Sequence, residues 1–358
     1  MSKVDSFLDH LERRLNIHVV QQILRESELI SARSWSELKM IVKSAANQDA
    51  TILDRLKVAL IMQQLCDLKA VSFYEVTPSA ATLIDLKLKT SVITPTSLSA
   101  SFPIDASDSV LSSDNGQLKP IFKYSDNYGS GIVLSRRREF TVSNEINFSS
   151  FSPEMKRQFP KADKIIEVKS YNKQTYDVVY LNKAHGILEI RADVTREDGQ
   201  QQTAGQLNKS VDDLRAYASG FVSSAVKGYD LGLPINLLPL TKKVYEDGSG
   251  AIKKIGFATE EESVKRETMK AGVDLRSELF HKTGAKAIDH KMSIFEVAIQ
   301  WHGADVIGGV SGSKPEIHIP GSYRDYTKPG ARTDYLFVKG VRSYADANFI
   351  IEKLKSYK

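Results

Sequence analysis

Two acidic residues and an arginine near the middle of the chain have the types and spacing from which a metal-dependent hydrolytic site could be built. Asp177 lies in one segment rich in β-branched residues, and the triplet Glu189-Ile190-Arg191 lies in the next. Carboxylate oxygens from neighbouring strands are suitable ligands for a hard divalent cation such as Mg²⁺. Whether the chain can use this chemistry depends on the strands that must bring these side chains to one face of a sheet.

The sequence around these residues predicts a meander of three antiparallel strands, because apolar runs alternate with short polar turns. The strands are expected at residues 165–171, 176–181 and 187–194, with turns at residues 172–175 and 182–186. We expect Leu181 to face Ile187 across the second turn. Side-chain alternation then places Asp177, Glu189 and Arg191 on one face. Both faces stay substantially apolar, so the meander should be covered on both sides at the centre of the fold.

An acid on one strand followed by an E-x-basic triplet on the next resembles the pattern of the PD-(D/E)xK nuclease superfamily. The resemblance implies that Asp177 and Glu189 hold a divalent metal while a lysine activates water. In this sequence Arg191 stands at the lysine position, and a guanidinium does not release its proton at any usable pH. The alternative interpretation is a structural ion-pair cluster of Asp177, Glu189, Arg191 and Asp193, which would be costly to break if partly buried.

The composition limits the remaining classes of function. The 358 residues carry a formal net charge of +5 with a pI near 8.9, a mildly basic balance that does not by itself indicate nucleic-acid binding. The single cysteine, Cys66, excludes an internal disulfide and a cysteine-based zinc site, as is typical of a cytoplasmic protein. The histidines lack metal-binding spacing, and the Walker, GxGxxG and GxSxG motifs are absent. We therefore expect no metal site and no cofactor.

The N-terminal sequence and the hydropathy of the chain also bear on its location. The first residues alternate charged and apolar side chains without the long apolar core of a signal peptide. No run of about 18 apolar residues occurs, so no membrane insertion is expected. We expect a cytoplasmic protein; the sequence gives no indication of its oligomeric state.

The distribution of helical and strand patterns predicts an α+β fold: a helical N-terminal domain, then a largely antiparallel sheet body with packed helices and a C-terminal α/β unit. The expected divisions are a helical domain at residues 1–90, a Ser/Asp-rich linker or long loop at 91–120, a central sheet domain at 121–245, and a C-terminal α+β unit at 246–358, separate from the central domain or continuous with it.

The helical domain admits two interpretations. A capping-box pattern predicts a helix from Trp35, a second apolar helix follows from about residue 50, and residues 70–76 read as a strand. This order is compatible with a helix-turn-helix that carries a β-wing. A recognition helix needs a polar, basic outer face, however, and residues 52–70 are mostly apolar. A helical bundle that docks a partner is the favoured interpretation.

Two basic segments are candidate binding sites for nucleic acid or a protein partner. The first is an arginine-rich strand, in which alternation places Arg136 and Arg138 on one face. The second is a loop that combines charges with aromatic rings able to stack on bases. Its candidate residues are Tyr323, Arg324, Tyr326, Lys328 and Arg332. The alternative for both segments is a solvated surface without a ligand.

These patterns favour an intracellular, non-enzymatic binding protein that acts through nucleic acid or a protein partner. Two alternatives belong to other classes, a PD-(D/E)xK-like metal-dependent nuclease and a protein-only adaptor or scaffold. A nuclease should lose cleavage but not its fold in Asp177→Ala and Glu189→Ala. An adaptor should bind its partner with little dependence on salt, whereas phosphate binding weakens strongly as salt rises.

Overall fold

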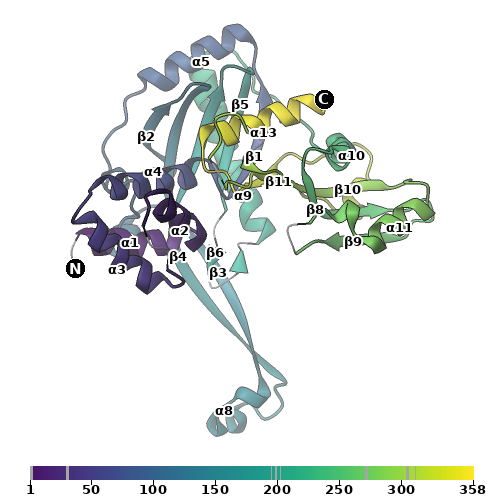
Figure 1. The fold of residues 1–358 in the computed structure, drawn as a ribbon, viewed down its shortest axis with the longest axis horizontal. Coiled ribbons are helices and arrows are strands. Elements are labelled where there is room, and N and C mark those ends of the chain that lie inside the picture. The colour runs from purple at the N-terminus through teal and green to yellow at the C-terminus, as the bar shows by residue number, and fades with distance from the viewer. Residues whose placement is uncertain are drawn as a thin grey trace.

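The structure, a computed structural model, is an α+β fold built on a ten-stranded sheet in which every neighbouring pair of strands is antiparallel (Figure 1). It describes residues 3–29, 32–194, 196–197, 200–201, 203–270, 273–303, 306–310 and 312–358. The strand order is β2-β3-β4-β5-β1-β12-β11-β10-β8-β9. The strands are β1 Lys69–Glu75, β2 Lys119–Ser125, β3 Gly129–Asn147, β4 Lys164–Asn182, β5 Ile187–Asp193, β8 Ala251–Ala258, β9 Val264–Thr268, β10 Ser293–Gln300, β11 Glu316–Ile319 and β12 Leu336–Lys339, with β6 Arg196–Glu197 and β7 Gln200–Gln201 forming a separate ribbon.

The helices begin mostly at serine or threonine caps, as at Ser34, Thr203 and Ser343, whose side chains accept a hydrogen bond from the first turn. Among the described residues, none of the helices has the length and apolar character needed to cross a bilayer. The helices are α1 Lys3–Arg14, α2 Ile17–Glu26, α3 Trp35–Ala46, α4 Thr51–Cys66, α5 Pro78–Thr90, α6 Ser97–Ser101, α7 Asp108–Ser113, α8 Pro153–Gln158, α9 Ala204–Ala225, α10 Thr241–Glu246, α11 Leu279–Ala287, α12 Tyr323–Tyr326 and α13 Tyr344–Ser356, with 3-10 turns at Phe148–Ser150, Leu238–Leu240 and Leu275–Ser277.

The sheet is covered unequally on its two faces. One face packs against α10, α13 and the end of α4 in a core that includes Leu65, Val178 and Ile351. The other face packs against α5 and α9, whose apolar stripe contacts β-strand residues such as Leu188 and Ile190. This second cover lies over the half of the sheet formed by β2, β3, β4, β5 and β1. The other half of that face, from β12 to β9, carries mainly polar side chains.

The N-terminal helices form their own apolar cluster, in which α4 packs against α1, α2 and α3. Because the last turn of α4 enters the sheet core, this helix joins the bundle to the sheet. β1 follows directly and lies between β5 and β12, in the middle of the sheet. The wing of a winged helix-turn-helix lies at the edge of its sheet. β1, the strand considered for that role, lies inside the sheet instead.

The predicted domain boundaries stay predictions, but the structure places several of their segments. β1 and α5, within residues 1–90, belong to the sheet and to its cover. Residues 91–120 contain α6 and α7, whose Leu98 and Leu111 are buried in the same core as α10, α13 and the end of α4. The strands of residues 246–358 continue the same sheet as those of residues 121–245.

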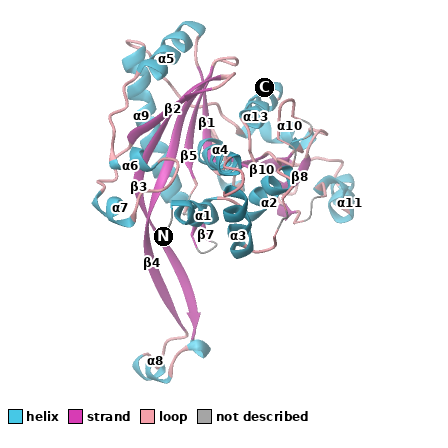
Figure 2. Cartoon of the chain, turned by 60° about the vertical axis from the view of Figure 1, so that its left-hand side comes forward, coloured by secondary structure: helices cyan, strands magenta, loops and turns pink. Residues whose placement is uncertain are grey.

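The predicted turn at residues 172–175 is wrong. β4 runs without interruption from Lys164 to Asn182 and pairs along its whole length with β3. The two strands extend beyond the body as a long hairpin with α8 at its tip (Figures 1 and 2). The polar residues expected to form the turn find partners inside the sheet: Gln174 Nε2 donates to Ser135 Oγ at 3.0 Å, and Thr175 Oγ1 donates to the Arg136 carbonyl at 3.4 Å.

The predicted register across the next turn is also wrong, by one residue. Leu181 pairs with Leu188 rather than with Ile187, and Asn182 belongs to the strand. The Asn182 side chain accepts a hydrogen bond from the His185 amide and donates one to Asn348 on α13. An asparagine typical of turns is therefore held in the strand by its side-chain partners. Since one step of register exchanges the faces of a strand, this shift decides where the predicted site residues point.

Candidate nucleic-acid interface

Asp177 points to the face of the sheet that α9 covers, and it is fully buried. Arg138 donates hydrogen bonds to both of its carboxylate oxygens, at 2.6 and 2.5 Å. The guanidinium of Arg136 lies 4.0 Å away, and the Asp193 amide donates a third hydrogen bond at 2.8 Å. All of these partners belong to the protein itself, and the carboxylate is fully buried, so neither of its oxygens faces an open cleft.

Glu189 and Arg191 point to the opposite face, where they form a buried ion pair with 3.0 Å between the guanidinium and the carboxylate. Arg191 also donates to the Leu65 carbonyl at 3.1 Å and lies over the Tyr180 ring at 4.6 Å from its centre. Burial raises the pKa of Glu189 above its ordinary value, although Arg191 opposes this shift. The expectation that Asp177 and Glu189 share one face is therefore wrong, and they cannot hold one cation together.

Asp193 lies on the same face as Glu189 but has different partners. The ammonium of Lys69 is 2.8 Å from its carboxylate, Arg14 is 3.6 Å away, and the Tyr176 amide donates a hydrogen bond at 3.1 Å. Burial disfavours the charged carboxylate, but the two cations outweigh it and lower the pKa of Asp193. The four predicted cluster residues are thus divided between two faces of the sheet. Within the described part of the chain, no group of three or more His, Cys, Asp or Glu side chains is placed to hold a metal ion.

The two predicted binding arginines of the strand, Arg136 and Arg138, are engaged within the protein. Arg136 donates to Asp213 of α9 at 2.7 Å, and Arg138 is bound to Asp177 as described above. Each side chain is only about a tenth exposed. Their guanidinium groups therefore connect β3 to α9 and β4 and do not form a free phosphate-binding surface.

The predicted aromatic loop forms the short helix α12 and the turn that follows it. Tyr323 and Tyr326 pack on the buried ring of Phe295, with ring centres 6.2 and 6.5 Å apart. Arg324 is exposed beside them. The helical turn thus brings two tyrosines and an arginine together beside β8 and β10.

The two other cations of this loop have internal partners. Lys328 pairs with Asp325 at 2.6 Å. Arg332 pairs with Asp334 at 2.9 Å and donates to the Pro234 carbonyl at 2.6 Å.

The half of the sheet face left open by α9 holds a groove of about 640 Å³, which we call the open-face groove. Its floor consists of Lys254 on β8, Ala298 on β10, His318 on β11 and Phe337 on β12. Apart from Glu316, its ionisable lining is basic or histidine. The lysines that line it with exposed or half-buried side chains are Lys253, Lys254, Lys270, Lys314 and Lys339. A sixth, Lys69, is fully buried, and its ammonium pairs with Asp193 on the opposite face.

Aromatic rings occupy the floor of the open-face groove. His318 and Phe337 are stacked, with ring centres 5.6 Å apart and 25° between their planes. Tyr335 meets the edge of Phe337 at the same distance. Both stacked residues are partly exposed. A planar ligand can therefore reach a π-surface between the lysines.

The acids below the open-face groove are neutralised by their own partners. The carboxylate of Glu296 lies 2.6 Å from the ammonium of Lys254, 2.9 Å from Nε2 of His318 and 3.1 Å from the guanidinium of Arg266. Burial disfavours its charge, but the hydrogen bonds from His318 and Lys254 outweigh this and lower the pKa of Glu296 to about 2. Glu316 pairs with Lys339 at 2.8 Å.

Lys270 and Lys314 are exposed at the rim of the groove and form no ion pair with another described residue. The groove therefore keeps a surplus of positive charge.

This groove was not predicted from the sequence, because the lysines that line it come from five separate segments of the chain. A usable signal was present in the strands Glu316-Ile317-His318-Ile319 and Leu336-Phe337-Val338-Lys339, in which apolar residues alternate with charged or aromatic ones. Such alternation indicates one buried and one exposed face. No protein-family model matches the chain, and no curated protein sequence matches it.

Proposed function

We propose that this is a non-enzymatic binding protein that takes up a single-stranded nucleic acid in the open-face groove. The observation that carries the proposal is the stacked pair His318–Phe337 on an exposed sheet face flanked by lysines. Bases of a single strand stack on aromatic side chains, while a positively charged groove follows the phosphates. Because stacking tolerates any base, we expect weak sequence preference.

The shape of the groove favours a single strand over a duplex. Reading a duplex requires a helix or a two-stranded ribbon that enters a groove of the DNA, whereas this surface is concave. From β12 to β8 the sheet makes three interstrand steps, a width of roughly 14 Å at about 4.8 Å per step. Sheet platforms of this kind accommodate two or three stacked bases. Tyr323, Arg324 and Tyr326, beside Phe295 of β10, are the residues that we propose contact a strand longer than the groove.

Fluorescence anisotropy with labelled dT20 and U20 tests the proposal. If about four lysines contact phosphates, a slope of roughly −0.7 per contact predicts a loss of affinity of roughly 50-fold between about 50 and about 200 mM salt. The double variant Lys270→Glu/Lys314→Glu should bind at least about tenfold more weakly at low salt and show a flatter salt dependence. Phe337→Leu should weaken binding without changing the salt slope, because it removes stacking but no charge.

Lys57→Glu is the matched control, since Lys57 is an exposed lysine on α4 and is absent from the groove lining. It should leave the affinity within about twofold. Equal affinity in the wild type and in the double variant would refute the proposal, as would the absence of binding at about 50 mM salt. In that outcome, a protein ligand whose affinity hardly depends on salt would identify the adaptor alternative instead.

A further inference from the structure

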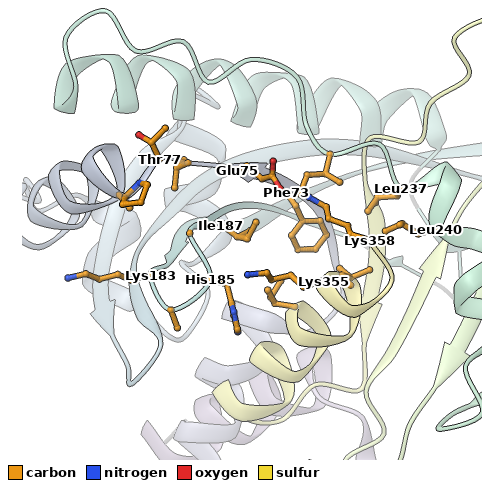
Figure 3. Close-up of a pocket in the computed structure, with 18 of the residues that line it drawn as sticks. Phe73, Glu75, Thr77, Lys183, His185, Ile187, Leu237, Leu240, Lys355 and Lys358 are labelled. Atoms are coloured by element: carbon orange, nitrogen blue, oxygen red, sulfur yellow. Dashed lines mark hydrogen bonds and ion pairs between the residues drawn. The ribbon is translucent and has the colours of Figure 1, made fainter.

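A second cavity, of about 700 Å³, lies at the end of the sheet where β1 ends and the β4–β5 turn begins (Figure 3). Its interior is apolar: Phe73 and Ile187 come from the sheet, Leu237 and Leu240 from the segment that leads into α10, and Ile351 and Leu354 from α13. Each of these side chains belongs to the core on the sheet face that packs against α10, α13 and the end of α4. The cavity is therefore an opening into the core, with a volume typical of small-molecule sites.

The mouth of this cavity carries more positive than negative charge. Lys183, Lys355 and Lys358 line it together with one acid, Glu75, which pairs with Lys358 at 2.5 Å. Lys355 forms no ion pair with any described residue.

Lys183 donates a hydrogen bond to the Asp85 carboxylate at 3.4 Å, and that carboxylate also accepts hydrogen bonds from Lys89 at 2.8 Å and Ser130 at 2.7 Å. Among the three lysines, Lys355 is therefore the one available for an anion.

One further group at the mouth favours a negative charge. The first turn of α5, capped by Thr77, lines the cavity, and the N-terminus of this 13-residue helix carries the positive end of its dipole. His185 also lines the cavity, beside Lys355 (Figure 3), but its Nε2 is buried 3.9 Å from the Glu352 carboxylate. Burial and the nearby Lys355 lower the pKa of this imidazole, so it adds no positive charge at neutral pH. The positive potential at the mouth therefore comes from Lys355 and the start of α5.

We propose that this cavity binds a small amphipathic anion, with an apolar chain or ring in the pocket and a carboxylate or phosphate at Lys355 and the start of α5. The apolar interior stabilises the bound apolar part of the ligand, and Lys355 favours a negatively charged headgroup over a positively charged one. The cavity shares no lining residue with the open-face groove. The proposal is therefore independent of nucleic-acid binding.

Isothermal titration calorimetry on the full chain tests this proposal with four probes below their micelle concentrations: decanoate, decyl phosphate, decyltrimethylammonium and inorganic phosphate. Decanoate or decyl phosphate should bind, and comparison of the two identifies the preferred head. Decyltrimethylammonium, with an equally long chain but the opposite charge, and inorganic phosphate, which has no chain, should each bind at least about tenfold more weakly.

Two variants locate the site. Lys355→Glu should weaken binding of the anionic amphiphile at least about tenfold, while Lys57→Glu, the control, should not change it. Ile235→Trp should fill the cavity and abolish binding; its melting temperature shows whether the variant is folded. Lys355→Glu alters only an exposed side chain and keeps the test valid if the tryptophan variant unfolds. Three results would each overturn the proposal. They are equal affinity for decyltrimethylammonium and for the anionic amphiphiles, no binding of decanoate or decyl phosphate, and undiminished binding of the anionic amphiphile in Lys355→Glu.

Discussion

Asp177 and Glu189 lie on adjacent strands of the sheet, yet their side chains point to opposite faces. The pairing of Val178, rather than Asp177, with Arg191 is the cause. Each acid consequently has its own arginine, Arg138 for Asp177 and Arg191 for Glu189. The acids are separated by the sheet itself, so this part of the protein is a pair of internal salt bridges on two sides of one layer.

Removal of Arg138 should strongly destabilise the protein, because the fully buried Asp177 carboxyl would lose its main partner. We expect Arg138→Leu to lower the free energy of unfolding by about 3 to 5 kcal/mol. The double variant Arg138→Leu/Asp177→Leu should recover part of this loss, since neither member of the pair is then left buried without the other; Arg136 keeps its partner Asp213. Urea denaturation followed by circular dichroism measures both. A loss below about 1 kcal/mol in the single variant would show that the pair is not needed.

The sequence predicted those elements whose signals are local. The helices predicted from Trp35 and from about residue 50 are confirmed, the first with its serine cap, and so is the strand predicted at residues 70–76. In these segments, side chains and backbone groups a few residues apart determine the conformation. The α+β class followed from the same signals.

Features that depend on distant residues were not predictable in this way. Asparagine is typical of turns, and one of the two side-chain partners that hold Asn182 in β4 is Asn348, 166 residues away. Likewise Lys69, the partner of Asp193, comes from a segment 124 residues earlier. No local pattern identifies such partners. Register and site geometry therefore depend on pairings that the sequence does not display.

His10 should make stability fall as the pH decreases. Burial, together with the nearby arginines Arg13 and Arg14, outweighs Asp105 and lowers the pKa of His10 to about 4. The Asp105 amide points at His10 Nδ1, 3.5 Å away, an arrangement that fits a neutral ring. Between pH 6.5 and 4 the unfolded chain binds a proton that the folded protein excludes, so stability is full above 6.5 and is lost as the pH falls toward 4.

From pH 7 to pH 5 this effect amounts to about 2 kcal/mol. His10→Gln should lack that part of the pH dependence, whereas exposed His302→Gln should retain it. Urea denaturation at the two pH values provides the measurement. If the free energy of unfolding falls by the same amount from pH 7 to pH 5 in the wild type and in His10→Gln, then His10 is not buried in its neutral form.

Cys66 should be unreactive in the folded protein. Burial raises the pKa of its thiol to about 11, although the Arg191 guanidinium 3.2 Å away opposes this shift. Compared with the ordinary value of 9.0, the thiolate fraction near neutral pH is then about a hundredfold smaller. Because this is the chain's single cysteine, the release of thionitrobenzoate from Ellman's reagent reports on it alone. We expect slow labelling at pH 8 and rapid labelling in urea; rapid labelling without urea would contradict the buried position.

Excision of the distal hairpin should leave the body of the protein intact. The outer parts of β3 and β4 pair only with each other, and exposed Ile166 and Val168 contribute little to a core. A two-stranded ribbon of this kind is marginally stable by itself and adds little to the cooperative unit. Replacement of residues 143–168 by Asn-Gly, a sequence suited to a two-residue hairpin turn, rejoins Val142 to Lys169, which already face each other.

Differential scanning calorimetry should give a melting temperature within a few degrees of the wild type for this shortened chain, and its affinity for dT20 should be unchanged if the open-face groove alone binds the strand. A large drop in melting temperature would mean that the hairpin packs against the body. Unchanged melting with weaker dT20 binding would instead add the hairpin to the binding surface. The two measurements therefore distinguish a structural hairpin from one that contacts the ligand.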